Sequence, residues 1–154
     1  MAKKYQVSMY TDGSCSRNGD PNAVGGYCAI LTCKGKEKTV KGYEARTTNN
    51  RMELRAVIEG MKALKAPSAV TVYTDSEYVA KNSTSAAKWL AEGTSRANMD
   101  LWKQLLDTAK AGQHELAFEH VKGHIGHPYN TRCDKIARQE TSLGIMELVV
   151  LNCS

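Results

Sequence analysis

The feature that most constrains this chain is a phrase that occurs twice, Tyr-Thr-Asp followed by a small residue, at residues 10–14 and 73–76. Each copy closes a run of alternating apolar residues, the pattern of a half-buried strand. Each strand therefore delivers a carboxylate, Asp12 or Asp75, followed by a small residue that lets the backbone turn. A single Asp there is a routine turn or cap residue. If the strands are parallel neighbours, the two carboxylates meet at one sheet edge and are suited to a divalent metal.

The rest of the chain supplies the other elements of such a sheet. Periodicity and turn residues predict, in order, strands at 5–11, 27–33 and 39–47, a helix at 51–65, a strand at 69–74, short helices at 76–81 and 86–90, a helix at 101–112, a strand at 115–121 and a helix at 130–140. A meander followed by two helix-crossover strands predicts an α/β fold. Its five-stranded mixed sheet has three antiparallel and then two parallel strands, flanked by helices.

Composition places the chain among cytoplasmic globular domains. Its 154 residues are enough to form a hydrophobic core that needs no disulfide or metal to stabilise it. A content of 42% hydrophobic residues with only three prolines argues against disorder. Five cysteines without close pairing fit reduced thiols, and we expect neither a signal peptide nor a membrane span. The net charge of +5 is compatible with a polyanionic partner, although a solvated surface explains it equally well.

Two further acids stand near the predicted site. Glu53 falls in the first turn of the first long helix, at the margin of its buried face, and Asp134 falls in the first turn of the last helix, beside its buried face. Taken singly, each is an ordinary partner for the helix dipole. With Asp12 and Asp75 they make four acids that the predicted topology brings toward one edge of the sheet.

The motifs around these acids resemble those of a known family. In order along the chain stand Thr-Asp-Gly-Ser, Thr-Thr-Asn-Asn-Arg-Met-Glu-Leu, Thr-Asp-Ser and Val-Lys-Gly-His-x-Gly-His-Pro-x-Asn-x-Arg-Cys-Asp. These strings, in a βββαβαβα order, resemble ribonuclease H of the bacterial type 1 class. The match runs from about residue 5 to residue 140 and rests on four separated segments. It implies a ribonuclease H-like fold over residues 1–142 and leaves residues 143–154 as a tail of unknown role.

The resemblance implies a metal site and a catalytic role for a histidine. The four acids that would hold two Mg²⁺ ions, with Mn²⁺ as a substitute, are Asp12, Glu53, Asp75 and Asp134. Mg²⁺ takes oxygen ligands, and two ions can clamp the attacking and leaving oxygens of a phosphodiester displacement. We expect Asp12 to bridge the ions and at least one of the crowded acids to bind a proton readily without metal. His127, on a glycine-flanked loop, would move protons or release product.

The resemblance also implies substrate contacts, at Asn18, Arg46, Thr48, Asn49, Asn50 and Glu77. The amides would touch an RNA·DNA hybrid, and Arg46 with Thr48 would grip a phosphate of the DNA strand, with little sequence preference. Discrimination of RNA rests on the 2′-hydroxyl. Glu77 stands where the family often has Gln. Many bacterial members of the family carry a long Lys- and Trp-rich protrusion after the fourth strand that grips the DNA strand. Here the segment 83–99 has only two basic residues, Lys88 and Arg96, which predicts weaker binding of the hybrid and a shallower salt dependence than in those members.

The function expected is a monomeric endonuclease that hydrolyses the RNA strand of RNA·DNA hybrids and leaves 3′-hydroxyl and 5′-phosphate ends. A non-catalytic nucleic-acid binding module on the same fold is the main alternative, although binding alone gains nothing from clustered negative charge. A zinc-binding domain that uses His124, His127 and Cys133 fails on ligand spacing. A strand-transfer nuclease of this fold is disfavoured by the block at 47–54.

Overall fold

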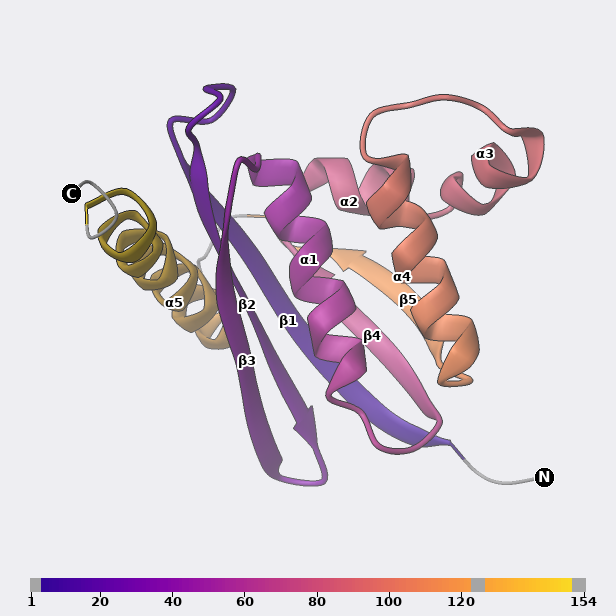
Figure 1. Cartoon of the computed structure of the whole chain (residues 1–154). Coiled ribbons are helices and arrows are strands. Elements are labelled where there is room, and N and C mark those ends of the chain that lie inside the picture. Colours follow the sequence, from indigo (N-terminus) through magenta and orange to yellow (C-terminus); the bar gives the residue numbers. More distant parts are fainter. Residues whose placement is uncertain (1–3, 123–126, 151–154) are drawn as a thin grey trace.

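The computed structural model describes residues 4–122 and 127–150, with side chains through residue 148. Its elements are, in order, β1 (Tyr5–Ser16), β2 (Val24–Cys33), β3 (Lys36–Ala45), α1 (Asn49–Lys62), β4 (Ser68–Thr74), α2 (Glu77–Asn82), α3 (Ala86–Glu92), α4 (Met99–Ala111), β5 (Glu115–His120), α5 (Pro128–Gly144) and a π-helical segment, η1 (Ile145–Val150) (Figure 1). The predicted order of strands and helices is confirmed. None of the described helices is long and apolar enough to cross a membrane.

The five strands form one sheet in the order β3-β2-β1-β4-β5. β1, β2 and β3 pair antiparallel, whereas β4 pairs parallel with both β1 and β5. The mixed sheet expected from the sequence is therefore confirmed. The turn between β2 and β3 consists of Lys34 and Gly35, both with positive φ (51° and 77°). Such a two-residue turn matches the twist of the strands, and β3 consequently begins three residues earlier than predicted.

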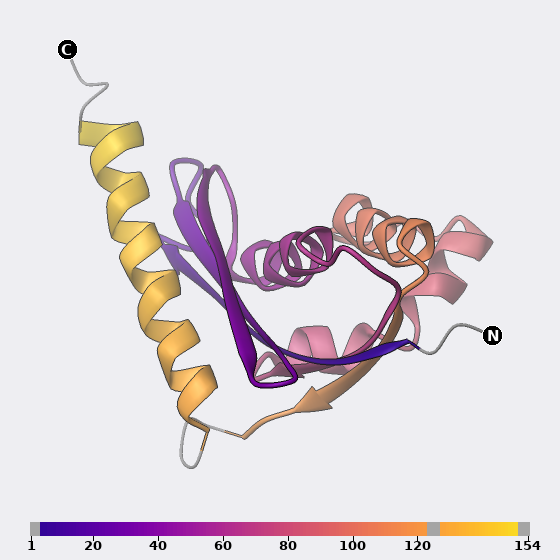
Figure 2. The ribbon, with the colours of Figure 1, turned by 90° about the horizontal axis from the view of Figure 1, so that it is seen from below.

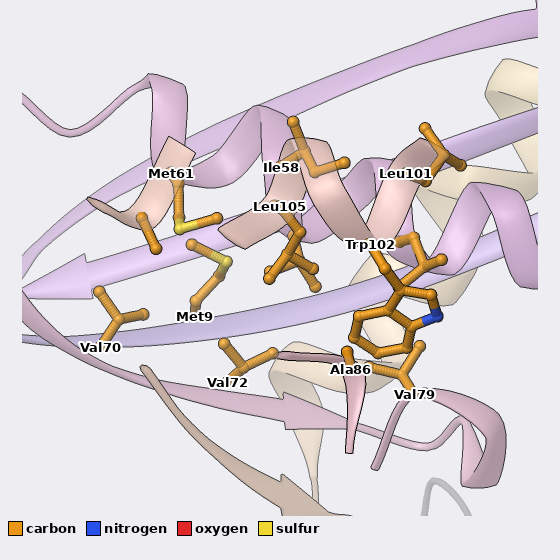
Figure 3. Close-up of a cluster of buried hydrophobic side chains, with 14 of the residues drawn as sticks. Met9, Ile58, Met61, Val70, Val72, Val79, Ala86, Leu101, Trp102 and Leu105 are labelled. Carbon is orange, nitrogen blue, oxygen red and sulfur yellow. The ribbon is translucent and has the colours of Figure 1, made fainter. Parts of the chain in front are cut away.

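Helices cover the two faces of the sheet unequally. α1 and α4 pack together on one face, and α5 lies on the opposite face across β1, β2 and β3 (Figure 2). The larger core lies under α1 and α4, where Met9, Ile58, Val72, Trp102 and Leu105 are at most 1% exposed (Figure 3). Their burial removes apolar surface from water, which is the main stabilising contribution to this fold.

Close packing on the α5 face depends on small residues. A Cβ atom placed on Gly26 of β2 would lie 2.3 Å from the carbonyl oxygen of Ala137, so only glycine lets α5 approach this closely. Cys28, Ile30 and Cys133 complete a second, smaller buried cluster. α5 runs to Gly144 and η1 continues to Val150, so the described part of the 143–154 tail is helical and forms no edge strand.

Candidate metal centre

The two copies of the repeated phrase lie side by side. β1 and β4 run parallel, and their last paired residues are Thr11 and Thr74. Asp12 and Asp75 follow immediately at the same level, and α1 brings Glu53 against them. One carboxylate oxygen from each of these three acids lies within 4.8 Å of the others. The sequence prediction of parallel neighbours is therefore confirmed, and a third acid joins the pair.

The local sequence explains how α1 reaches β1. A Cβ atom on Gly13 would lie 2.6 Å from the backbone nitrogen of Glu53, so this glycine permits the close approach. It does not turn the chain as expected, because β1 continues through antiparallel pairing with β2 as far as Ser16. Thr48 caps α1 by accepting a hydrogen bond from the Arg51 amide at 3.2 Å. Since α1 begins at Asn49, Glu53 lies beyond the first turn and is buried, not marginal as predicted.

Two of the three acids are held where charge is costly. Asp12 and Glu53 are only 4% and 8% exposed. Burial, followed by the negative charge of Asp75, raises the pKa of Asp12 to about 8. Burial, followed by the charge of Asp12, also raises the pKa of Glu53 well above its usual range. Without a cation the cluster therefore retains protons near neutral pH, as crowding of like charges predicts.

The donor set fits a divalent cation. The Oδ2 atom of Asp12 and the Oε2 atom of Glu53 are buried with no hydrogen-bond partner among the described residues. Buried carboxylate oxygens left without a donor are rare unless an ion, water or functional role accounts for them. Hard divalent cations prefer such oxygen ligands. Asp12, Glu53 and Asp75 are thus placed to hold such an ion.

Asp134 approaches the cluster from α5. Because α5 begins at Pro128, two residues earlier than predicted, Asp134 lies in its second turn instead of its first. It is outside the group of three mutually close acids, and its Oδ1 atom accepts a hydrogen bond from Arg138 Nε at 3.2 Å. The negative charge of Asp134 nevertheless contributes to the raised pKa of Asp12.

The four acids line an open depression of about 550 Å³, here named the acidic depression. Its lining residues are Asp12, Gly13, Ser14, Cys15, Asn49, Asn50, Glu53, Asp75, Ser76, Asp134 and Arg138. Asn49 and Asn50 belonged to the sequence-predicted set, whereas Ser14, Cys15, Ser76 and Arg138 did not. The i,i+4 spacing of Asp134 and Arg138 on one helix was a signal that could have identified Arg138.

The remaining predicted substrate residues lie around the acidic depression or farther away. Asn18 is exposed, and its side-chain oxygen accepts a hydrogen bond from the Asn49 amide at 3.1 Å, which joins the β1–β2 loop to the start of α1. Arg46 is exposed and has a positive φ of 53°. Thr48 is the N-cap of α1. Glu77, the first residue of α2, is exposed and is not among the residues described as lining the depression.

The histidine predicted for catalysis stands at the start of α5. His127 is exposed, forms the N-cap of that helix and accepts at its carbonyl oxygen from Thr131. His124 lies outside the described residues. Cys133 is fully buried, and its thiol donates to the carbonyl oxygens of Tyr10 and Cys28. A buried thiol engaged in this way gives no support to the zinc site weighed above.

Comparisons with known proteins agree with this geometry. The RNase H family model matches residues 4–142. A ribonuclease H of Caldicellulosiruptor saccharolyticus is 50% identical over 141 residues, covering 86% of this chain and 94% of the relative. One of Escherichia coli O139:H28 is 47% identical over 140 residues, covering 86% and 87%. The crystal structure of LC9-RNase H1, a type 1 RNase H with the type 2 active-site motif, superimposes with a TM-score of 0.81 at 27% identity, covering 92% of this chain and 74% of that one.

Proposed function

The chain belongs to the RNase H family, whose members are enzymes that hydrolyse phosphodiester bonds, and from this premise we propose that it cuts the RNA strand of RNA·DNA hybrids with two Mg²⁺ ions. The observation that carries the proposal is the group of three carboxylates within 4.8 Å, two of which present buried oxygens that receive no hydrogen bond from the part of the chain that the structure describes. In a protein that only binds nucleic acid, such an arrangement would be unfavourable, because the carboxylates would repel the phosphates and weaken binding.

The acids divide the work according to their positions. Asp12, Glu53 and Asp75 would hold the ions at the end of the parallel pairing, with Asp12 as the ligand that both ions share, and Asp134 would complete the set from α5. Two ions, when bound, supply a hydroxide-like water and stabilise the leaving 3′ oxygen of an in-line displacement, which leaves 3′-hydroxyl and 5′-phosphate ends. The raised pKa values of Asp12 and Glu53 make metal binding compete with protons, since ligating carboxylates must be deprotonated.

The hybrid lies across the acidic depression. Asn49 and Asn50 line it, and Asn18 is bonded to Asn49, so these amides form one continuous polar rim for the duplex. Arg46 and Thr48 precede that rim and bind a phosphate of the DNA strand. Amide and hydroxyl contacts with base edges and sugars carry little sequence preference, and the 2′-hydroxyl distinguishes the RNA strand.

Further roles belong to the same proposal. His127 moves protons or assists product release, and exposed Glu77 weakens contacts with the minor groove. Residues 1–142 are the catalytic domain, acting as a cytoplasmic monomer, and residues 143–154 are a C-terminal tail to which no role is assigned. Mn²⁺ can replace Mg²⁺, since both ions accept oxygen ligands.

A cleavage assay tests this function. RNA·DNA hybrid, duplex RNA and duplex DNA of one sequence, each labelled in separate preparations on one strand or the other, are incubated with Mg²⁺ or Mn²⁺. We expect only the RNA strand of the hybrid to be cut. Asp12→Asn should lower the rate at least about a hundredfold, because it removes the bridging charge. Asp107→Asn, which neutralises an exposed acid of α4 far from the site, is the matched control and should keep full activity.

Two results would overturn the proposal. An intact hybrid after incubation with either metal would exclude the activity itself. Full activity in Asp12→Asn would exclude the assigned site even if the hybrid were cut. Cleavage of duplex DNA at the same rate as hybrid would instead favour a nuclease without selectivity for the 2′-hydroxyl.

A further inference from the structure

Three tyrosines form a continuous stack on the α5 face of the sheet. Tyr10 of β1 and Tyr73 of β4 are register partners, and their ring centroids are 5.0 Å apart at an interplanar angle of 15°. Tyr129 of α5 covers the other side of Tyr10, at 4.6 Å and 21°. The guanidinium group of Arg132 lies 5.5 Å from the Tyr129 ring. The stack thus joins two strands to a helix that is distant in sequence.

The stacked residues lie close to the acids of the depression. Tyr10 stands two residues before Asp12, and Tyr73 stands two residues before Asp75. Alternate residues of a strand point to the same face, so Tyr10 and Asp12, both within β1, are on the side of the sheet that α5 covers. Tyr129 belongs to the helix that carries Asp134. The stack therefore links the three elements that deliver three of the four acids.

The first turns of α5 are held by contacts with β1 and β4. Among the described residues no side-chain cap is formed by His127, and no acidic residue stands in the first turn. The same two strands instead receive hydrogen bonds from the helix. Asn130 Nδ2 donates to the carbonyl oxygen of Tyr73 at 3.4 Å, and Cys133 Sγ donates to that of Tyr10 at 3.1 Å. The backbone and the rings of these tyrosines thus both fix the first turns of α5.

The other side of the helix is fixed from β3. Arg132 donates two hydrogen bonds to the carboxylate of Glu37, at 3.0 and 2.7 Å. A bidentate pair of this geometry is directional. It holds α5 to β3, so rotation of α5 about its axis would break both the ion pair with Glu37 and the stacking of Tyr129 on Tyr10.

Asp134 is the acid that this arrangement controls. Asp12, Glu53 and Asp75 come from β1, α1 and the end of β4, and they are already within 4.8 Å of one another. Asp134 reaches the depression only through the placement of α5. It lies one helical turn beyond Asn130 on the same side of the helix. A shift of about 1 Å in such a ligand is enough to impair a functional site.

From these contacts we propose that Tyr129 is a positioning residue. By stacking on Tyr10, which stacks in turn on Tyr73, it fixes the distance of α5 from the sheet and its rotation about its axis, and so places Asp134 to bind the metal. This inference rests on the proposed function. The stack does not touch the substrate and acts only through Asp134. Substitution of Tyr129 should therefore weaken the affinity for Mg²⁺ more than the affinity for the hybrid.

The test compares Mg²⁺ binding in Tyr129→Leu, which removes the ring, and Tyr129→Phe, which keeps it. Mg²⁺ affinity is measured by titration calorimetry and by the shift of the urea midpoint with Mg²⁺, without substrate. Tyr129→Leu should weaken Mg²⁺ binding about tenfold, as expected for loss of a group that orients a ligand. Tyr129→Phe should match the wild type. Tyr5→Leu, an exposed tyrosine at the far end of β1, controls for the substitution itself.

A double-mutant cycle with Asp134→Asn separates positioning from packing. If Tyr129 acts through Asp134, Tyr129→Leu should weaken Mg²⁺ binding less than about twofold in the Asp134→Asn background. In the cleavage assay, Tyr129→Leu should raise the Mg²⁺ concentration for half-maximal rate while the KM for hybrid changes less than about twofold. If Tyr129→Leu does not fold, Tyr73→Leu takes its place, because it removes the contact between Tyr73 and Tyr10. The same changes in Mg²⁺ affinity and in KM are then expected of it.

The outcomes are distinct. Unchanged Mg²⁺ affinity in the folded Leu variant, or an equal loss with and without Asp134, would overturn the positioning role while the nuclease function stands. An inactive wild type that binds Mg²⁺ would overturn the function, and the substrate-free titrations would still decide the role of the stack.

Discussion

The core beneath α1 and α4 and the acidic cluster at the sheet edge both bury side chains but are opposite in character. α1 contributes to both, because it turns Leu54 and Ile58 into the core and the neighbouring Glu53 toward Asp12. In the core every buried side chain gains by leaving water. In the cluster, carboxylates are removed from water beside one another, and two of their oxygens have no hydrogen-bond partner among the described residues.

This difference indicates where stability and function separate. Buried like charges destabilise the folded state, and they persist only where many other contacts hold the charged side chains in position. Here the core supplies the rigidity that holds the cluster in place. Removing a core side chain should therefore destabilise the protein, whereas removing a cluster carboxylate should stabilise it in the absence of metal.

The largest effect is expected in the core. Trp102 is 1% exposed, and its indole nitrogen donates to the Tyr78 hydroxyl at 3.0 Å. Trp102→Ala should lower the free energy of unfolding by about 3–5 kcal/mol, through lost burial and a cavity. Urea unfolding measures this. Leu143→Ala, at a side chain 42% exposed, is the control and should cost less than about 1 kcal/mol. Similar losses for both variants would mean that the core is not the stabilising region.

The second effect tests the cluster with metal. A cation that binds only the folded protein should raise the free energy of unfolding by about 2.7 kcal/mol at a hundred times its Kd. The folded Trp102→Ala variant should show the same gain from Mg²⁺, because its cluster is intact. Asp12→Asn should lose most of the gain. If Trp102→Ala loses the stabilisation by Mg²⁺ while Asp12→Asn retains it, the acidic cluster is not the region through which Mg²⁺ stabilises the protein.

The third effect is the pH dependence of the metal-free protein. The pKa of Asp12 is raised to about 8, so the proton it holds stabilises the folded state below the ordinary pKa near 4, and this contribution is lost as the pH rises toward 8. In EDTA, Asp12→Asn should lack this loss and should be more stable than the wild type at pH 8.5 by about 1–3 kcal/mol. Urea unfolding at pH 5.5 and 8.5 measures it, and parallel pH profiles for the two proteins would contradict it.

The two regions also differ in how far the sequence predicted them. The doubled Tyr-Thr-Asp phrase, read with the crossover helices, was enough to place Asp12 and Asp75 together, because parallel strands bring like positions to one edge. The apolar positions of α1 likewise predicted its buried face. Both signals are local periodicities combined with one topological rule, and tertiary context did not override them.

What the sequence could not supply came from contacts between distant elements. Antiparallel pairing with β2 extends β1 past Asp12 to Ser16, so the carboxylate lies within a strand rather than after it. The stacking of Tyr129 on Tyr10 likewise depends on neighbours that no local pattern reveals, whereas the start of α5 at Pro128 carries a local signal, a proline at the first helical position. The raised pKa of Asp12 followed qualitatively from crowding, but its extent depends on burial that only the fold defines.

The smallest effect concerns the helix that both regions share. Thr48 caps α1 through its hydroxyl, one turn before Glu53, while the core holds the rest of the helix. Thr48→Ala should lower the free energy of unfolding by about 1 kcal/mol, and Thr48→Ser, which keeps the hydroxyl, should restore it. Urea unfolding with and without Mg²⁺ adds the sharper comparison. If fraying at the cap disturbs Glu53, the loss will be larger with Mg²⁺ because the metal gain also falls. Equal losses in both conditions would show that core packing alone holds Glu53 in position.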